Sequence, residues 1–294
     1  DGDTPMVLGL GFFDCVHLGH KKLLTEVIRR AKELGCAPSA LTFSTNPGTK
    51  SHSGVQVYSF LERICAMENL GIENIVYAKF DATLRELSGE QFLDILTSNF
   101  NVSEVIAGPD FRFGKGARCD VLDLSKYLAN KNISTNIVDF YYIGRQKLSS
   151  GNIRDLICEG EIERANQLLS EPYFFLSTIK SQRGRGRKLG FPTANMQENY
   201  VRTMPKEGVY ATSVEFDGVR YKSVTNVGGK PTFSDNEFAV ESYILDFSGD
   251  LYGKQVKLIF WKRLRDIAAF DNPDRLKNRI ESDINIRREM KTND

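Results

Sequence analysis

The sequence predicts two domains: a doubly wound α/β domain with a parallel sheet, then a mostly β domain that is an antiparallel barrel or sandwich with a C-terminal helix. Three observations support this fold class. The chain of 294 residues has room for two domains of ordinary size. Short β-rich runs alternate with helical periodicity from residue 6 to about residue 140. Beyond Glu171-Pro172 the apolar period changes from 3.6 to 2, so we expect domains at 1–171 and 172–294.

The first domain is expected to contain five strands separated by helices. The strands are expected at 7–10, 37–43, 74–79, 102–107 and 135–140. The first helix should end at Gly35, since glycine readily takes the left-handed conformation that follows a helix. Its apolar face carries Leu23, Leu24, Val27, Ile28, Ala31 and Leu34. Later helices are expected at 60–70 and 121–129, and Ser88-x-x-Gln91 is a capping box that opens another.

The second domain is preceded by the segment 153–169, which is expected to form two short helices around Gly160. Asp217-Gly218 is a strong signal for a two-residue hairpin. A last helix should begin at Pro273, where Leu276, Ile280 and Ile284 form an apolar stripe. The strands of this domain are expected at 208–216, 219–227, 239–247 and 255–262.

Composition and charge exclude several classes of protein. Apolar residues make up 41% and charged residues 26% of the chain, which is typical of globular rather than disordered proteins. The net charge of +1 provides no overall field for nucleic acid, and no apolar run approaches the roughly 18 residues of a membrane span. The five cysteines form no CxxC pair, and no export signal opens the chain. We expect a soluble cytoplasmic protein with reduced thiols and without nucleic-acid or membrane partners.

The first candidate site is His17-Leu18-Gly19-His20, which joins the strand at 7–10 to the following helix. The carboxyl end of a parallel strand and a helix N-terminus together favour phosphate, and Gly19 allows a nucleotide triphosphate to come close. Nucleotidyl transfer needs donors that stabilise charge on the α-phosphate and no covalent nucleophile. The alternative is a tight turn with two incidental histidines. A zinc site is disfavoured, because the sequence offers no third ligand cluster.

The second candidate site begins with a basic, glycine-rich run that contains Gly184 and Lys188. Its cations and backbone N–H groups would bind a triphosphate. If the segment that follows is extended, Thr193 and Asn195 point the same way, and two oxygen ligands on one side suit Mg²⁺. An RGG-like nucleic-acid segment or a solvated basic loop is the alternative.

Glu241 is the third candidate. It shares one face of the run 239–247 with Tyr243, Leu245 and Phe247. Desolvation of a carboxylate on an apolar face makes it a better general base for a primary hydroxyl. The alternative is that this face is the solvent side of an edge strand.

These motifs resemble the prokaryotic bifunctional riboflavin kinase/FAD synthetase family over about residues 6–288. The nucleotidylyltransferase half is similar in its HxGH turn, in the loop GPDFRFGKG at 108–116 and in the segment KLSSGNIR at 147–154. The resemblance implies that Asp110 and Arg112 shape an FMN site. It implies that ATP is bound by His17, Gly19, His20, Ser149, Ser150 and Arg154.

The sequence departs from the family pattern at several positions in this half. In the family's GNFDG turn, Phe12 replaces asparagine and Cys15 replaces the final glycine, a residue that permits a left-handed φ. The family's PHP segment contains Asn46, and its Ser-Ser-Thr ends in Gly151. None of these changes removes His17, His20 or Arg154.

The second half resembles the riboflavin kinase barrel, whose GFPTAN motif matches 190–195. The resemblance implies that Thr193 and Asn195 bind Mg²⁺ with ATP, and that Glu241 deprotonates the ribityl 5′-hydroxyl for in-line attack on the γ-phosphate. Arg265 and Phe270 stand in a segment similar to the family's LRxExxF and are implied in flavin binding, with Ile267 in place of the acidic residue.

The resemblance therefore implies a bifunctional enzyme that phosphorylates riboflavin to FMN and adenylylates FMN to FAD, with ATP and Mg²⁺. Two alternatives remain open from the residues. The chain could be a riboflavin kinase alone, whose N-terminal domain serves assembly or regulation. It could also be a flavin- or RNA-binding regulator that uses the basic run 183–188, and its RNA affinity would then fall steeply with salt.

Overall fold

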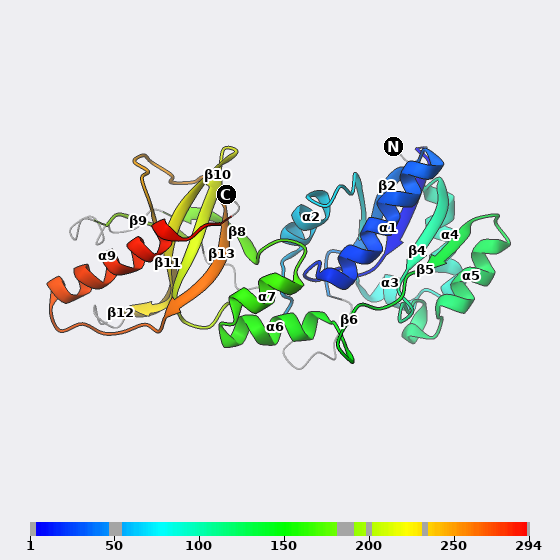
Figure 1. Cartoon of the computed structure of the whole chain (residues 1–294). Helices are drawn as coiled ribbons and strands as arrows, with labels where there is room; N and C mark the ends of the chain where they lie inside the picture. Colours follow the sequence, from blue (N-terminus) through cyan, green and yellow to red (C-terminus); the bar gives the residue numbers. More distant parts are fainter. Residues whose placement is uncertain (1–3, 47–54, 181–190, 198–201, 231–234, 293–294) are drawn as a thin grey trace. The chain divides into compact units, whose positions relative to one another are not determined.

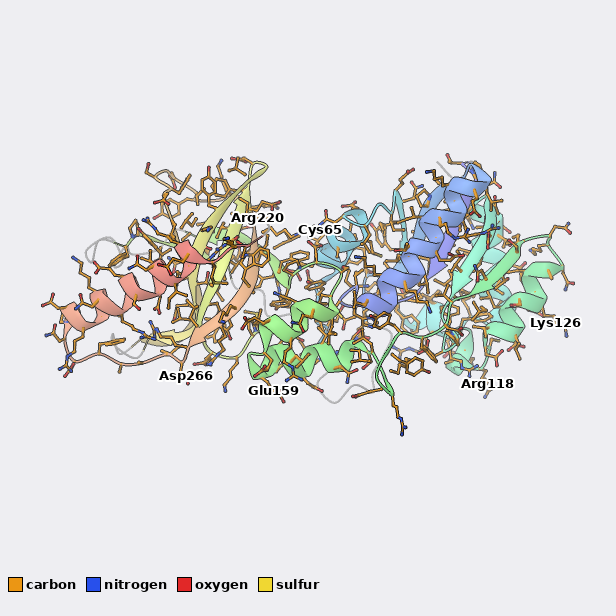
Figure 2. All side chains as sticks on the ribbon, viewed as in Figure 1. Cys65, Arg118, Lys126, Glu159, Arg220 and Asp266 are labelled. Atoms are coloured by element: carbon orange, nitrogen blue, oxygen red, sulfur yellow. The ribbon has the colours of Figure 1, made fainter. Side chains whose placement is uncertain are left out.

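The computed structural model describes residues 4–46, 55–180, 191–197, 202–230 and 235–292 (Figure 1). The chain divides into two compact units, Asp1–Asn152 and Ile153–Asp294. Charged side chains such as Arg118, Lys126 and Glu159 are exposed and project from the ribbon (Figure 2). Each unit has its own buried apolar core, so the two-domain organisation predicted from length and periodicity is present.

A parallel five-stranded sheet forms the centre of the first unit. Its strands are β1 (Met6–Leu10), β2 (Ala37–Phe43), β3 (Asn74–Ala78), β4 (Val102–Ala107) and β5 (Ser134–Ile137), in the order β3-β2-β1-β4-β5. All five predicted strands are present, but β5 ends at Ile137 rather than at residue 140. There the chain leaves the sheet for an antiparallel hairpin of β6 (Tyr142–Ile143) and β7 (Gln146–Lys147), which is too short to show a period in the sequence.

Helices cover both faces of this sheet. They are α1 (Leu18–Leu34), α2 (Phe60–Glu68), α3 (Ala82–Glu86), α4 (Gly89–Asn99) and α5 (Val121–Ala129). A Cβ at Gly9 of β1 would lie only 2.9 Å from Val27 of α1. Leu8 and Leu10 instead share a core with leucines of α4 and α5. Since successive strand residues point to opposite faces, α1 lies on one face and α4 and α5 on the other, which confirms the doubly wound architecture.

The ends of α1 follow from its sequence. Gly35 has φ 65° and its N–H bonds to the carbonyl of Ala31, which is the predicted helix end. Leu34, however, is 46% exposed, so its place on the predicted apolar face is wrong. The reason is length, because the 17 residues of α1 span about 25 Å whereas the five residues of β1 span about 17 Å. The last turn of α1 therefore extends past the strand that it covers.

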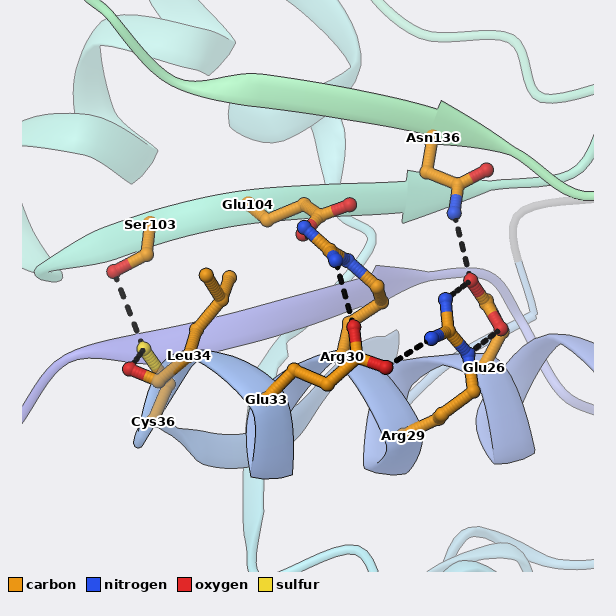
Figure 3. A network of polar contacts seen from close by, with 9 residues as sticks. All are labelled: Glu26, Arg29, Arg30, Glu33, Leu34, Cys36, Ser103, Glu104 and Asn136. Atoms are coloured by element: carbon orange, nitrogen blue, oxygen red, sulfur yellow. Dashed lines mark hydrogen bonds and ion pairs between the residues drawn. The ribbon is translucent and has the colours of Figure 1, made fainter.

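Polar contacts tie α1 to the strands beneath it (Figure 3). Arg30 Nε lies 2.8 Å from a carboxylate oxygen of Glu104 on β4, and Glu104 is buried. Glu26 accepts a hydrogen bond of 2.9 Å from Asn136 of β5. Glu26 and Arg30 are four residues apart and so lie on one face of the helix. These contacts fix the rotation of α1 and with it the direction of the residues at its N-terminus.

The second unit is built around a closed antiparallel barrel in the order β10-β11-β12-β9-β8-β13. Its strands are β8 (Phe174–Lys180), β9 (Thr193–Met196), β10 (Gly208–Phe216), β11 (Val219–Lys230), β12 (Asp235–Ile244) and β13 (Gln255–Arg265). Helices α6 (Ser150–Glu159) and α7 (Ile162–Leu168) precede the barrel and α9 (Pro273–Glu289) follows it. Closure decides in favour of the barrel over the sandwich.

The two faces of the barrel wall differ in what they bury. Side-chain hydroxyls from Thr212 to Ser242 form a fully buried chain of hydrogen bonds on the inner face. Val224, on the other face, shares an apolar cluster with Ile280 and Ile284 of α9, which confirms these two residues of the predicted stripe, while Leu276 is half-buried outside that cluster. Glu241 is next to Ser242 in the strand and therefore belongs to the outer face.

The strand ends of the barrel are set by left-handed residues. Phe216 pairs with Val219 across Asp217 and Gly218, whose φ values are 51° and 75°, so the predicted hairpin is confirmed. β12 spans Asp235–Ile244 rather than 239–247. Asp246 has φ 55°, which turns the chain out of the strand before the predicted end.

The helix pair α6 and α7 forms around Gly160 as predicted. The Asn166 side chain accepts a hydrogen bond from Tyr173 N and donates one to Phe260 O, both of 2.8 Å, and thereby joins α7 to the barrel. All but the first three residues of this pair accordingly fall within the second compact unit. The limit between the two functional domains at 171/172 concerns activity and stays a prediction.

Candidate active sites

The strand order of the first unit reverses between β1 and β4. Open α/β sheets bind ligands at the carboxyl ends of the strands beside such a switch point. The segment that follows β1 contains His17 and His20, and the segment that follows β4 contains Asp110. The fold therefore brings the HxGH turn and the loop 108–116 to the same edge of the sheet.

His17 caps the N-terminus of α1. Its Nδ1 accepts hydrogen bonds from the backbone N–H groups of Gly19 at 3.1 Å and His20 at 3.3 Å. A ring nitrogen that accepts carries no proton, so neutral His17 holds its proton on Nε2. The cap thereby fixes the tautomer and leaves Nε2–H as a hydrogen-bond donor.

His20 stacks on His17, with ring centroids 3.8 Å apart and planes 12° apart. The ring of Phe13 meets that of His20 edge-on, with ring centroids 5.4 Å apart and planes at 82°. Within the described residues, the buried Nδ1 of His20 has no hydrogen-bond partner. A buried polar atom of this kind fits a ligand, because an unmet hydrogen bond in a dry site costs free energy.

Both histidines are neutral near pH 7. Desolvation lowers the pKa of His17 to about 4, with a further contribution from the positive charge of Lys147 and an opposing one from Asp110. Desolvation also lowers the pKa of His20, and electrostatic repulsion from Lys147 and from the protonated form of His17 acts in the same direction. The pair therefore offers neutral N–H donors to an anionic substrate.

Two glycines are required by close contacts in this turn. A Cβ at Gly19 would lie 3.0 Å from Cε1 and 3.1 Å from Nδ1 of His17, so a side chain there would displace the imidazole. A Cβ at Gly11 would lie 2.7 Å from the ring of Phe13. The glycine of the HxGH motif thus leaves room for its own histidine as well as for a ligand.

Left-handed backbone in the turn falls at Phe13 and Val16, with φ values of 53° and 45°. Cys15 does not have a positive φ, so the implied left-handed position is wrong by one or two residues. Phe13, Cys15 and Val16 are all buried. Such conformations cost of order 1 to 3 kcal/mol each and persist only where neighbouring contacts hold them.

Asp110 and Lys147 meet beside the histidines. They form an ion pair, and the Lys147 ammonium also lies 3.7 Å from the centroid of the Phe140 ring. Both charges act on the pKa of His17. The structure therefore adds Lys147 to the site. Its position at the start of the KLSSGNIR segment was the available signal in the sequence.

The loop 108–116 is anchored by alternate residues. Phe113 is buried in the core of the first unit, and Phe111 stacks on it at 5.8 Å. Asp110 and Arg112 lie on the exposed side, where Arg112 pairs with Asp120, the N-cap of α5, at 3.0 Å. The two residues implied in flavin binding thus lie on the exposed side of the loop, and Phe111 and Phe113 anchor its other side.

The N-terminus of α6 carries the serines implied in ATP binding. Ser149 Oγ donates to Asn152 Oδ1 at 2.8 Å and accepts from Asn152 N at 3.4 Å, so Ser149 caps the helix. Ser150 opens the helix and Arg154 lies one turn further along. A Cβ at Gly151 would meet only Ser149 Oγ at 3.5 Å, an ordinary contact, so the site has room for the threonine of the family.

In the barrel, strand register brings the kinase candidates together. Glu241 of β12 lies opposite Asn195 of β9, and Tyr243 lies opposite Thr193. Directly opposed residues of antiparallel strands share a face, with Cβ atoms about 4.5 to 5.5 Å apart. On the other side of β12, Glu241 lies opposite Asn226 of β11. β12 is not an edge strand, so the alternative for Glu241 is excluded, and Asn226 is a neighbour that sequence reasoning missed.

The two oxygen-bearing residues implied in Mg²⁺ binding fit that ion. Asn195 Nδ2 donates to Thr193 O at 3.3 Å, while its buried Oδ1 has no partner in the described part of the chain. An amide oxygen in this state suits a hard cation that takes oxygen ligands. No group of three or more His, Cys, Asp or Glu residues with metal-binding geometry occurs among the residues described.

Arg265 is engaged by α9. Its Nε and Nη2 lie 2.9 and 2.8 Å from Oδ2 of Asp283, which is 1% exposed. Phe270 is half-buried in the connection between β13 and α9. The Cδ1 of Ile267 would lie 2.7 Å from a Cβ at Gly228 of β11. Gly184 and Lys188 lie outside the described residues.

Comparison with known proteins decides the family. The family model described as FAD synthetase matches residues 2–152, and the one described as riboflavin kinase matches 169–291. A bifunctional riboflavin kinase/FMN adenylyltransferase of Listeria monocytogenes is 34% identical over 96% of this chain and 91% of its own length. The chain belongs to this bifunctional family. A relative of the same description from Bacillus subtilis is 34% identical over 94% of this chain and 90% of its own length.

As a member of this bifunctional riboflavin kinase/FMN adenylyltransferase family, the chain carries both enzyme domains. A solved structure described as a macrolide-efflux protein from Streptococcus pneumoniae superposes with a TM-score of 0.85. It is 27% identical and covers 99% of this chain and 96% of its own. In the described ranges of our chain, no helix is both long and apolar enough to span a membrane.

Proposed function

We propose that the chain makes FAD from riboflavin in two steps, each with ATP. The barrel transfers the γ-phosphoryl group of ATP to riboflavin, and the α/β unit transfers the adenylyl group of a second ATP to FMN. The observation that carries the proposal is a cluster of candidate residues in each unit: the stacked imidazoles of His17 and His20 at the switch point, and Glu241 directly opposite Asn195 in the barrel.

In the kinase step, Glu241 accepts the proton of the 5′-hydroxyl of riboflavin, and the oxygen attacks the γ-phosphorus as ADP leaves. Thr193 and Asn195 would hold Mg²⁺, which neutralises charge on the phosphates when it is bound. Support comes from the register, which sets Glu241 directly opposite Asn195. Arg265 and Phe270 are proposed to limit the flavin site, and Gly184 and Lys188 to bind phosphate.

In the adenylylation step, a phosphate oxygen of FMN attacks the α-phosphorus of ATP, and pyrophosphate leaves. Nε2–H of His17 and the imidazole of His20 donate hydrogen bonds to phosphate oxygens on which charge develops, and no covalent intermediate with the protein is needed. Gly19 admits the phosphates, and the N-terminus of α6 with Ser149, Ser150 and Arg154 binds the nucleotide. Asp110 and Arg112 are proposed to contact FMN.

The first experiment separates the two activities. Purified protein is incubated with ATP, Mg²⁺ and riboflavin, and separately with FMN under aerobic and reducing conditions, and the flavins are resolved by chromatography. FMN and FAD are both expected. Formation of FMN, with no FAD under both aerobic and reducing conditions, would show that the chain acts as a riboflavin kinase alone.

The roles of single residues are tested in the same assay. Glu241→Gln is expected to abolish FMN formation and to leave the conversion of added FMN to FAD intact. Glu215→Gln, which removes a carboxylate from the barrel wall at the Arg220 ion pair, serves as the matched control. Undiminished FMN formation by Glu241→Gln would remove the general base from the mechanism.

We place the enzyme in the cytoplasm, where ATP is available. The five free cysteines are compatible with a reducing compartment.

A further inference from the structure

Arg63 of α2 is a fully buried arginine beneath the HxGH turn. It is 0% exposed, and its guanidinium makes three hydrogen bonds. Nη1 donates to the carbonyl of Phe12 at 2.7 Å and to the hydroxyl of Thr42 at 2.8 Å, and Nη2 donates to the carbonyl of Phe43 at 2.7 Å. One planar group therefore joins the turn after β1 to the carboxyl end of β2.

The chain keeps this cation buried at a cost. Desolvation lowers the pKa of Arg63 to about 10, partly offset by Asp14, so the guanidinium remains charged near pH 7. In the described part of the chain its buried Nε has no hydrogen-bond partner. Well-packed apolar side chains can often replace buried charged groups without loss of stability, provided that no partner charge is left behind. Packing alone does not require an arginine at this position. Hydrogen bonding to two backbone carbonyls at once does require its planar fork of donors.

Phe12 adds a second contact to the same group. The guanidinium carbon of Arg63 lies 4.2 Å from the centroid of the Phe12 ring and 5.5 Å from that of Phe60. Arginine stacks on aromatic faces in this way, and the attraction grows as water is excluded. Arg63 thus holds Phe12 through both its carbonyl and its ring.

The turn held in this way is the strained one. Phe12 is followed by Phe13 and Val16 in left-handed conformations, and the next residue is His17. The hydroxyl of Thr42 also donates to Phe12 O, at 2.9 Å, so two donors converge on one carbonyl. Loss of that anchor would let the turn relax toward ordinary backbone angles and would move the cap residue of α1.

We infer that Arg63 is a positioning residue for adenylyl transfer, with Phe12 as its partner: it holds the 11–16 turn so that His17 and His20 stand in register with the phosphates. The inference rests on the adenylylation proposed above. It assigns the positioning of the two histidines to a residue that touches no substrate. A misplacement of about 1 Å in a site can cost about 10²-fold in rate.

The test compares Arg63→Lys and Arg63→Met with the wild type. Lysine keeps the charge but cannot reach both carbonyls with a fixed fork, and methionine keeps much of the volume without charge. We expect kcat for FAD formation to fall about 10- to 100-fold in both. KM for ATP should change much less, because the phosphate-binding groups remain. Arg29→Lys, at a half-exposed arginine of α1, is the matched control and should retain wild-type kcat.

Two readouts distinguish positioning from loss of folding. FMN formation by the same molecules is an internal standard, which should stay within about twofold of the wild type, a factor worth less than 0.5 kcal/mol. In the unliganded protein, the ¹⁵N resonance of His17 Nδ1 should show an accepting nitrogen in the wild type and should shift in both Arg63 variants. Retained kcat with an unchanged His17 resonance in Arg63→Lys would overturn the inference.

Failure of the proposed function has a different signature, namely no FAD from the wild type, and the His17 resonance then still tests the positioning role. The variant Phe12→Asn tests whether Phe12 and Arg63 act together. If Phe12 acts through Arg63, its effect on kcat should be much smaller in the Arg63→Met background than alone. Equal effects in both backgrounds would contradict the partnership.

Discussion

His17 performs two tasks with the two nitrogens of one ring. Nδ1 accepts the N–H groups that open α1, and Nε2–H points its proton away from the helix. Protonation of Nδ1 would destroy both cap hydrogen bonds. The low pKa of about 4 is therefore a consequence of burial that also preserves the helix end.

This coupling predicts a pH dependence of stability. Between about pH 6.5 and pH 4 the unfolded chain binds a proton at His17 and the folded chain does not, so the free energy of unfolding falls as the pH falls. The loss at His17 should reach about 3 kcal/mol. His17→Asn keeps a capping side chain without a titrating group. The free energy of unfolding can be measured by urea unfolding followed by circular dichroism. Between pH 7 and pH 4 it should fall more steeply for the wild type than for His17→Asn. Parallel curves would contradict the assignment.

Gly19→Ala provides a second test at the residue scale. The added Cβ would lie 3.0 Å from the ring of His17, and the ring has to move. We expect FAD formation to drop at least tenfold, a loss of about 1.4 kcal/mol in transition-state stabilisation, while FMN formation persists. Thr25→Ala, which leaves an alanine side chain at an exposed position of α1, is the control. Normal FAD formation by Gly19→Ala would show that the contact is relieved without cost.

At the scale of elements, α9 is attached to the barrel by buried charges. Arg265 pairs with Asp283, and the buried Arg287 donates to Thr212 O at 2.7 Å, where the pairing of β10 with β13 is irregular. A buried ion pair of this kind adds little net stability, but it favours one docked position of α9 on the barrel. Removing one partner leaves the other charge buried without a counter-ion.

Asp283→Ala should therefore destabilise the barrel by about 3 to 5 kcal/mol. Trp261 is the only tryptophan of the chain and lies on β13, so its fluorescence reports unfolding of this unit. Arg279→Ala removes an exposed partner at 3.7 Å from Asp283 and should cost much less than 1 kcal/mol. An equal cost for the two substitutions would mean that Arg265 and Asp283 do not form the main attachment.

Elements with local signals were predictable from the sequence and those with distant partners were not. The end of α1 at Gly35, the capping box at Ser88 and the hairpin at Asp217 depend on neighbours along the chain, and all three are confirmed. The pairing of β12 with β9 joins residues more than 40 positions apart, so the motifs named Glu241 and Asn195 but could not set them opposite each other. Arg63 was missed because its spacing in α2 resembles that of any surface arginine.

At the scale of the whole molecule, one chain carries two chemistries that share FMN, and the two proposed sites are built from different residues. The units have separate cores, and the two proposed sites share no described residue. We expect the two activities to be removable one at a time, with FMN passing between them through solution.

Complementation tests this expectation. Glu241→Gln alone should leave riboflavin unchanged, and His20→Ala alone should stop at FMN. An equimolar mixture of the two proteins should convert riboflavin to FAD, because FMN released by one chain is adenylylated by the other. If FMN had to be handed over within a single chain, the mixture would accumulate FMN without FAD.

The double task of His17 also bears on how relatives of this chain can diverge. A descendant that ceased to make FAD would still lose the start of α1 on mutation of His17 to most residues, so natural selection for a folded domain would continue to preserve it. His20 caps no helix, so loss of the proposed catalytic role would remove a larger share of the selection on His20 than on His17. Loss of the second histidine of the motif, with the first retained, is therefore the expected genetic mark of a silenced adenylylation domain in this family.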